Sequence, residues 1–275
     1  MSHFTRAEAC AIAIAETFRG DGEILISPIG NLPAIGARLA KLTFEPDLLL
    51  TDGVASIVAT VQPVGGAKGP EPIVESWMPY RSVFDCVWSG RRHVMMGATQ
   101  IDRFGNQNIA CIGDYEQPKA QLLGMRGAPG NTLNHPTSYW VPKHSTKVFV
   151  ENVDVVSGVG YDRAAALGER ASRFHEIRRV VSNLGVFDFD APDHRMRLAS
   201  VHAGVTVDEV VENTGFELAI DGKVPETRAP TDEELEILRE VLDPNGFGAK
   251  EVRDKSLHRP IRRSRSHPEE REVPP

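Results

Sequence analysis

The stretch Asp47-Leu48-Leu49-Leu50-Thr51-Asp52-Gly53 joins three consecutive leucines to a short polar end. A continuous apolar run of this kind is typical of a strand covered on both faces of a parallel sheet, and a buried helix is the alternative that periodicity leaves open. Its length and flanking residues favour the strand. In open parallel sheets, ligands bind beyond the carboxyl ends of the strands, where Thr51 and Asp52 would lie. These two residues are the first candidates for a catalytic site, and a plain Asp-Gly turn is the competing interpretation.

The segments before this strand predict a β-α-β unit. Thr5-Arg6-Ala7-Glu8 has the form of a capping box, and an amphipathic helix is expected to follow to about Arg19. A first strand is predicted at residues 23–27 and a second helix at residues 33–41. Because crossovers between such strands are right-handed, the strand ending at Asp52 should run parallel to the first strand.

The rest of the chain continues the α/β pattern. We predict strands at residues 93–97, 147–150, 179–182, 185–189 and 196–200, a partly helical segment at 77–88, and helices capped by Thr206 with Glu209 and by Thr231 with Glu234. The glycine-rich segments 65–70 and 123–135 are predicted to be loops, and a loop as long as the second is commonly functional. The fold class is therefore α/β, with an open, mainly parallel sheet and flanking helices.

Composition narrows the class of protein. The chain has 275 residues, 41% of them hydrophobic and 25% charged, which is typical of a globular protein with its own core. Its formal net charge of −7 argues against a general nucleic-acid binder, which needs a basic surface. The odd set Cys10, Cys86 and Cys111, without a C-x-x-C pair, favours a reduced, cytoplasmic setting and no metal site. The sequence predicts neither a secretion signal nor a membrane span.

Residues 247–275 differ in composition from residues 1–246. They contain few large apolar residues and many Arg, Lys, Glu and Pro, so we expect a disordered, charged tail after a single domain. The basic run Arg259–Arg265 is followed at once by Glu269, Glu270 and Glu272. That alternation of charge favours a solvated tail over a nucleic-acid-binding arm.

Three motifs in order resemble the β subunits of the family I coenzyme A transferases: residues 97–108 (Gly-Ala-x-Gln-x-Asp-Arg-x-Gly-Asn-x-Asn), 184–188 and 204–216. The resemblance runs from the first helix to about Leu242 and implies the coenzyme A transferase fold. Three more segments, residues 44–53, 90–94 and 129–140, resemble one branch of this family. Its members are actinobacterial hydrolases that open the last ring of the cholesterol nucleus while it is held as a coenzyme A thioester.

A departure at the strand end separates hydrolase from transferase. Transferases of this family carry a nucleophilic glutamate there, and alignment on Gly53 places Thr51 at that position. Asp52 is one methylene shorter and displaced by one residue, which in a strand points it to the other face. The resemblance therefore implies attack by water, without a covalent glutamyl-CoA intermediate. It also implies a main catalytic glutamate on a separate α subunit and an α2β2 assembly.

The expected site residues follow from the strand end and the resemblance together. Asp52 and Thr51 are the candidate catalytic residues. The residues expected to contact the coenzyme A part of the substrate are Gly53, Gly66, Gly69, Gln100, Arg126, Gly127, Gly130 and Asn134. No permanently bound cofactor is expected. Two alternatives stay open: a transferase subunit that moves coenzyme A between carboxylic acids, and a non-catalytic subunit that only supports the α chain.

Overall fold

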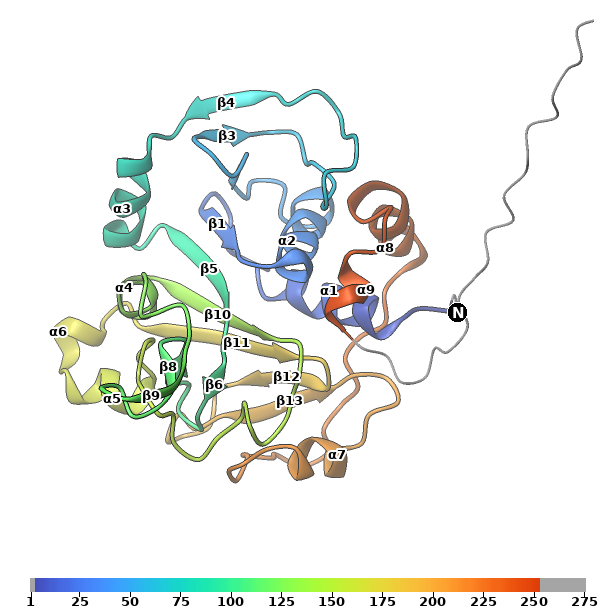
Figure 1. Ribbon diagram of the computed structural model, residues 1–275. Helices are drawn as coiled ribbons and strands as arrows, with labels where there is room; N and C mark the ends of the chain where they lie inside the picture. Colours follow the sequence, from blue (N-terminus) through green and yellow to red (C-terminus); the bar gives the residue numbers. More distant parts are fainter. Residues whose placement is uncertain (1–2, 253–275) are drawn as a thin grey trace, which may run out of the picture.

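A six-stranded sheet organises the chain in the computed structural model, which describes residues 3–252 (Figure 1). Its strands, in spatial order, are β1 (Leu25–Pro28), β5 (Arg92–Gly97), β10 (Pro136–Val141), β11 (Glu176–Ser182), β12 (Gly185–Asp188) and β13 (Arg197–Val201). The first four run parallel to one another, and the last two pairs are antiparallel. The prediction of an open, mainly parallel sheet is confirmed.

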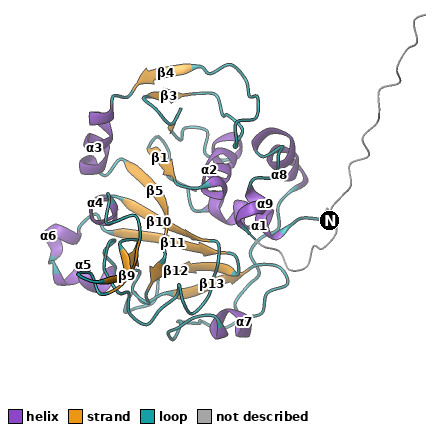
Figure 2. Ribbon diagram, viewed as in Figure 1, coloured by secondary structure: helices purple, strands orange, loops and turns teal. Residues whose placement is uncertain are grey.

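Shorter sheets and helices surround this sheet (Figure 2). The antiparallel sheets are β2 (Leu50–Thr51), β3 (Ser56–Val58) and β4 (Val74–Trp77); β6 (Gln100–Ile101) and β7 (Gln107–Asn108); and β8 (Cys111–Gly113) and β9 (Pro118–Gln121). The helices are α1 (Arg6–Glu16), α2 (Asn31–Thr43), α3 (Tyr80–Ser89), α4 (Ala128–Asn134), α5 (Tyr161–Ala166), α6 (Glu169–Ser172), α7 (Val207–Glu212), α8 (Asp232–Glu236), the π-helix η1 (Ile237–Leu242) and α9 (Gly248–Glu251). Between residues 3 and 252, none of the helices has the length and apolar character needed to cross a bilayer.

The six-stranded sheet is buried on both faces. Successive residues of β5 alternate between two hydrophobic clusters: Val94 and Met96 join one, and Met95 joins the other. Tyr139 and Trp140 of β10 divide in the same way. Side chains of a strand alternate between its faces, so a strand with apolar residues at every position needs a cover on each side. Helices α1 and α2 provide that cover on one face (Figure 1).

Helix α1 begins where the capping box predicts. The Thr5 hydroxyl accepts a hydrogen bond from the Glu8 N–H, and the Glu8 carboxylate accepts one from the Thr5 N–H at 2.7 Å. Thr231 and Glu234 make the same reciprocal pair at α8, and at α7 the Thr206 hydroxyl accepts from the Glu209 N–H. Three of the predicted helix starts are therefore set by local side-chain chemistry.

Helices α1 and α2 approach each other closely at Gly36. A Cβ atom at this position would lie 2.8 Å from Ile14 Cβ and 3.0 Å from the Ala11 carbonyl oxygen, both on α1. Both helices contribute to the same hydrophobic cluster, in which Ile14 and Ala37 are fully buried. The absence of a side chain at Gly36 therefore sets the distance between the two helices.

The predicted strand at residues 47–53 is shorter and less buried than expected. Leu48 and Leu50 are buried and Leu49 is half-buried, so the leucines do alternate between faces. Leu49 bridges Leu25 in the parallel direction, which confirms the expected β-α-β unit. Beyond that bridge, β2 leaves the main sheet and pairs with β3 instead.

Two predictions in the middle of the chain were wrong. The segment 123–135 is not loop throughout, because helix α4 occupies Ala128–Asn134 with Pro129 in its first turn, where its missing N–H is not needed. Residues 147–150 form no strand: the first two lie in a turn, and the segment pairs only through the bridge between Phe149 and Ile101. Phe149 is fully buried, and this burial explains the apolar pattern that resembled a strand.

Helix α9 lies inside the range expected to be a tail. Glu251 accepts hydrogen bonds from the Asn31 N–H at 2.8 Å and from the Trp140 indole N–H at 2.9 Å, so it joins the start of α2 to the end of β10. Val252 is buried against the same cluster. The rest of the expected tail, residues 253–275, lies outside the described residues.

The contact at Gly36 yields a prediction about stability. Gly36→Ala should lower the free energy of unfolding by about 1–3 kcal/mol, because the new methyl group overlaps Ile14. Gly130→Ala is the matched control, since a methyl group on this helical glycine would have no atom nearer than 3.8 Å and alanine favours helix. Urea denaturation measures both. Equal stability of Gly36→Ala and the parent would show that α1 and α2 can separate freely.

Candidate functional site

A cavity of about 210 Å³ lies at the end of β2. It is lined by Arg38 of α2, by Leu50, Thr51 and Asp52 at the end of β2, and by Val58, Thr60, Val61, Gln62 and Pro72 from β3 and the segment after it. The predicted catalytic pair therefore faces a real cavity. Its walls combine apolar side chains with hydroxyl, amide, carboxylate and guanidinium groups, a mixture typical of small-molecule sites.

Lys41 holds the end of α2 against the segment that enters β2. Its ammonium group donates hydrogen bonds to the Leu48 carbonyl at 2.7 Å and to the Pro46 carbonyl at 3.0 Å. These bonds fix the start of the strand relative to the helix. Arg38 lies on the same helix three residues earlier, and it faces the other end of the strand.

Asp52 has a defined role in the turn after β2. Its Oδ1 atom accepts hydrogen bonds from the N–H groups of Val54, Ala55 and Ser56 at 2.8, 3.0 and 3.1 Å. The Ser56 and Val54 N–H groups, the two largest influences, hold the pKa of this carboxyl below its usual value of 3.8. Gly53 takes the left-handed conformation that the turn requires, with φ at 84°. Asp52 therefore closes a turn and lines the cavity at once.

Thr51 lies beside this turn, and the predicted Gly69 lies beside another residue that lines the cavity. Thr51 is exposed, and its hydroxyl accepts a hydrogen bond from the Gly53 N–H at 3.2 Å. A Cβ atom on Gly69 would overlap the Gln62 side chain, which lines the cavity, and one on Gly66 would meet open space. The structure thus brings Thr51, Asp52, Gly53 and the loop of Gly69 to one place.

Gln100 lies outside the cavity at β2, and its side chain is hydrogen-bonded to other residues of the chain. It is buried, its carbonyl oxygen accepts hydrogen bonds from the Asn108 side chain at 2.7 Å and the Asp154 N–H at 3.0 Å, and its amide donates to Asp154. These bonds join β6 and β7 to a loop. Gln100 does not line the cavity at β2.

The remaining predicted residues cluster around α4. Gly127 precedes this helix, Gly130 and Asn134 lie within it, and Arg126 adopts a positive φ of 52° just before it. The Asn134 amide donates to the Gly130 carbonyl at 2.7 Å. Asn134 lines a separate cavity of about 350 Å³, bounded by Gly90 and the starts of β10 and β11, so this group does not share the cavity at β2.

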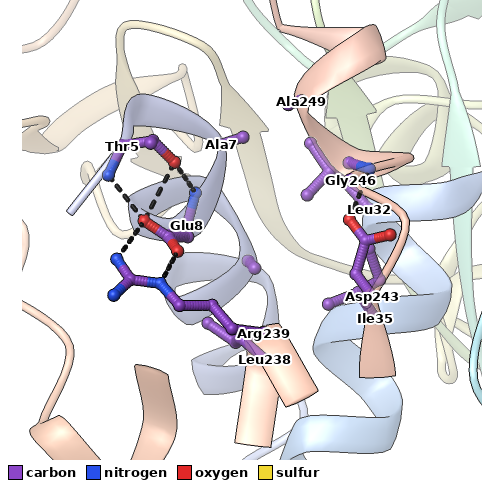
Figure 3. Close-up of a pocket in the computed structure, with 12 residues that line it drawn as sticks. Thr5, Ala7, Glu8, Leu32, Ile35, Leu238, Arg239, Asp243, Gly246 and Ala249 are labelled. Atoms are coloured by element: carbon purple, nitrogen blue, oxygen red, sulfur yellow. Dashed lines mark hydrogen bonds and ion pairs between the residues drawn. The ribbon is translucent and has the colours of Figure 1, made fainter. Parts of the chain in front are cut away.

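Figure 3 shows another pocket, of about 170 Å³, between α1, α2 and residues 238–249. Glu8 lies between Thr5 and Arg239 on one wall, and Asp243 on the other accepts from the N–H groups of Phe247 and Gly248. These ionised groups are already paired within the protein. Among residues 3–252, no three His, Cys, Asp or Glu side chains gather where they would hold a metal ion.

The prediction from sequence missed three polar residues of the cavity at β2: Arg38, Thr60 and Gln62. Arg38 lies in a segment that was correctly expected to be helical. The signal available for it was its position one turn before Lys41, on the face of the helix that looks toward the strand end. Thr60 and Gln62 follow an antiparallel strand, β3, that the sequence pattern did not predict.

Comparisons with known proteins identify the family to which this chain belongs. The family model for coenzyme A transferase matches residues 84–213. A subunit of the 3-oxoadipate CoA-transferase of Pseudomonas knackmussii is 31% identical over 87% of this chain and 94% of its own length. The glutaconate coenzyme A-transferase of Acidaminococcus fermentans superposes with a TM-score of 0.74 at 26% identity, over 89% of this chain and 96% of the other. The chain belongs to the coenzyme A transferase family.

Within this family, one group of relatives is much more similar in sequence. The cholesterol ring-cleaving hydrolase IpdB subunit of Rhodococcus jostii (strain RHA1) is 59% identical over 92% of this chain and 98% of its own length. The crystal structure of Rhodococcus jostii RHA1 IpdAB contains a chain that superposes with a TM-score of 0.86, over 92% of this chain and 100% of the other.

The turn at Asp52 predicts a pH dependence. Because the folded state lowers the pKa of this carboxyl, its three hydrogen bonds are intact above pH 3.8 and are lost as the pH falls through the lower folded pKa. The amide resonances of Val54 and Ala55 should therefore shift with a midpoint below 3.8 in an NMR titration of the folded protein. In Asp52→Asn this shift should vanish. A midpoint above 3.8 would contradict the hydrogen-bonded turn.

Proposed function

We propose that this chain is the β subunit of a heteromeric acyl-CoA hydrolase that opens the last steroid ring in cholesterol catabolism, held as a β-keto coenzyme A thioester. The observation that carries this proposal is the 59% identity to the IpdB subunit, which extends over nearly the full length of both chains. The similarity of the folds supports it further. The substrate brings its own coenzyme A, and the proposed enzyme holds no permanent cofactor.

The chemistry of this reaction fits the residues at the end of β2. Water adds its oxygen to the ring ketone, the bond from that carbon to the carbon beside the thioester carbonyl breaks, and the released electron pair takes a proton. The steps need a base, donors for the oxyanion and a fixed substrate, but no nucleophile from the enzyme. Thr51 and Asp52 would orient water or substrate at one wall of the site.

A covalent route through this chain has little support. Asp52 Oδ1 already accepts three backbone hydrogen bonds, and Thr51 has no histidine or carboxylate among its hydrogen-bond partners within residues 3–252. A hydroxyl nucleophile such as Thr51 needs a base within hydrogen-bonding reach. We therefore assign the main catalytic glutamate to the α subunit and propose no glutamyl-CoA intermediate.

The proposed enzyme includes an α subunit as partner, in an α2β2 assembly. An apolar surface on β4 and α3, here called the β4–α3 face, suits such a partner; it comprises Ile73, Val74, Trp77, Tyr80, Phe84 and Trp88. Trp77 is 74% exposed and Trp88 is 68% exposed. Several large aromatic side chains exposed within one patch are typical of protein-binding surfaces. The face adjoins the candidate site, because Trp77 pairs with Ser56, which follows the Asp52 turn.

A transferase subunit is the second candidate. The 31% identity to a subunit of a 3-oxoadipate CoA-transferase supports it. Under that alternative a carboxylate of this chain, Asp52, would form a covalent adduct with the acyl group and then with coenzyme A. A cytoplasmic location fits either candidate, since Cys10 and Cys111 are buried as free thiols.

Asp52→Asn separates the two candidates. The substitution keeps the oxygen that caps the turn and removes the charge, so turnover should fall by about 10–1000-fold while the complex still assembles. Asp47→Asn, at an exposed carboxylate at the start of the same segment, should leave turnover unchanged. Hydroxylamine trapping with peptide mass mapping should find no adduct on the parent enzyme. An adduct on Asp52, lost together with all turnover in Asp52→Asn, would establish the transferase mechanism.

The β4–α3 face gives a prediction about assembly. Trp77→Asp should weaken association with the α subunit by at least about tenfold, because it places a charge in an apolar interface. Tyr115→Asp is the matched control, since Tyr115 is a similarly exposed aromatic residue outside this face. Gel filtration and titration calorimetry of the two purified chains measure the effect. Equal affinity for both variants would place the interface elsewhere.

A further inference from the structure

Arg38 is the cationic group of the cavity at β2. The chain turns back from α2 into β2, so helix and strand run in opposite directions. Starting from the bond between Lys41 and Leu48, Arg38 lies about 4.5 Å back along the helix. Leu50 lies about 6.6 Å further along the strand. These two displacements bring Arg38 beside the strand end, where it lines the same cavity as Thr51 and Asp52.

The Arg38 guanidinium is half-buried, and no side chain or carbonyl within residues 3–252 makes a hydrogen bond or ion pair with it. Three other arginines of the fold are paired with carboxylates: Arg178 with Asp21 at 2.5 Å, Arg197 with Asp188 at 2.8 Å and Arg228 with Glu234 at 2.6 Å. Burial lowers the pKa of Arg38, but an arginine stays cationic. A partly desolvated charge without a partner destabilises the folded state, and an anionic ligand in the cavity would supply the missing partner.

The other walls of the cavity indicate what that ligand resembles. Leu50, Val58, Val61 and Pro72 supply apolar surface, and Thr60 and Gln62 supply neutral polar groups. Asp52 is the sole carboxylate among the lining residues described, and its Oδ1 atom accepts the three N–H groups of the turn. The cavity therefore suits an acyl group of modest size that carries a negatively charged oxygen group.

We propose that Arg38 binds an anionic oxygen group of the coenzyme A thioester, namely a carboxylate borne by the acyl chain. This inference rests on the proposed function for the thioester substrate. A planar guanidinium matches a carboxylate with two parallel hydrogen bonds. Hydrolytic ring opening creates such a carboxylate at the former ring ketone. A phosphate of coenzyme A has the same charge chemistry, and the experiment separates the two sources.

The experiment measures binding to the complex with its α subunit by titration calorimetry. The probes are glutaryl-CoA, whose acyl chain ends in a carboxylate, pentanoyl-CoA, a neutral chain of equal length, and free coenzyme A. The parent complex should bind glutaryl-CoA about 10–100-fold more tightly than pentanoyl-CoA. Arg38→Gln should abolish this difference, and Arg38→Lys should restore part of it. An equal loss for all three probes in Arg38→Gln would assign the anion to coenzyme A phosphate.

Arg179→Gln is the matched control. Arg179 is also half-buried, it lines a different cavity beside Arg178, and it too makes no ion pair with a carboxylate within residues 3–252. This variant should bind all three probes like the parent. Arg38→Gln should also raise the melting temperature by about 1–4 °C, since it removes an unpaired charge. Unchanged binding of every probe by Arg38→Gln would overturn the inference, and a lower melting temperature would identify Arg38 as a packing residue.

Hydrolysis of the thioester that carries the steroid ring is measured as well. This activity tests the proposed function, whereas binding of the three probes tests the role of Arg38. If the parent complex hydrolyses that substrate but Arg38→Gln binds every probe normally, the inference fails and the function stands. If Arg38→Gln alters binding of the probes but the parent complex has no hydrolytic activity, the function fails and the anion site stands.

Discussion

The candidate site depends on the close contact between α1 and α2 at Gly36. Because no side chain separates the helices there, α2 packs directly against α1, and Ile14 fills the space next to Gly36. From that position Lys41 reaches the Pro46 and Leu48 carbonyls, and the strand that follows starts in a fixed register. Packing in the core thus determines where the polar end of β2 meets the helix. A site built on a helix and a strand in this way is held more precisely than one built on loops alone.

Much of the fold was predictable because local chemistry and burial agree. Strand β5 is apolar at successive positions, and the capping boxes at Thr5 and Thr231 mark helix starts within four residues of sequence. Prediction failed where tertiary contacts override the local pattern. The buried Phe149 makes residues 147–150 resemble a strand, although Phe149 enters the core directly after a turn and not from a strand. The helix at Ala128–Asn134 was hidden by glycine and proline, which more often mark loops.

The site was predictable only in part, and the reason is geometric. Thr51 and Asp52 were expected from the rule that ligands bind at the carboxyl ends of parallel strands, and they do line a cavity, although β2 pairs with β3 in an antiparallel sheet. Arg38 belongs to a different element, and a single cation on a helix has no distinctive pattern in the sequence. Gln100 illustrates the opposite case: a polar residue in a strong motif can serve the fold, as its bonds to Asn108 and Asp154 do here.

The proposed partner and the unpaired Arg38 are linked by the exposure of the candidate site to solvent. The turn at Asp52 is exposed, and it leads through β3 to the β4–α3 face. A subunit seated on that face would cover the site and reduce its contact with bulk solvent, while leaving room for the water that the hydrolysis consumes. Electrostatic attraction grows as the surrounding dielectric constant falls, so Arg38 would hold an anion more firmly in the complex than in the single chain. The same covering would raise the cost of leaving the guanidinium unpaired. Assembly and substrate binding would then reinforce each other, because the anion binds more tightly in the complex and the coupling between two binding equilibria is reciprocal.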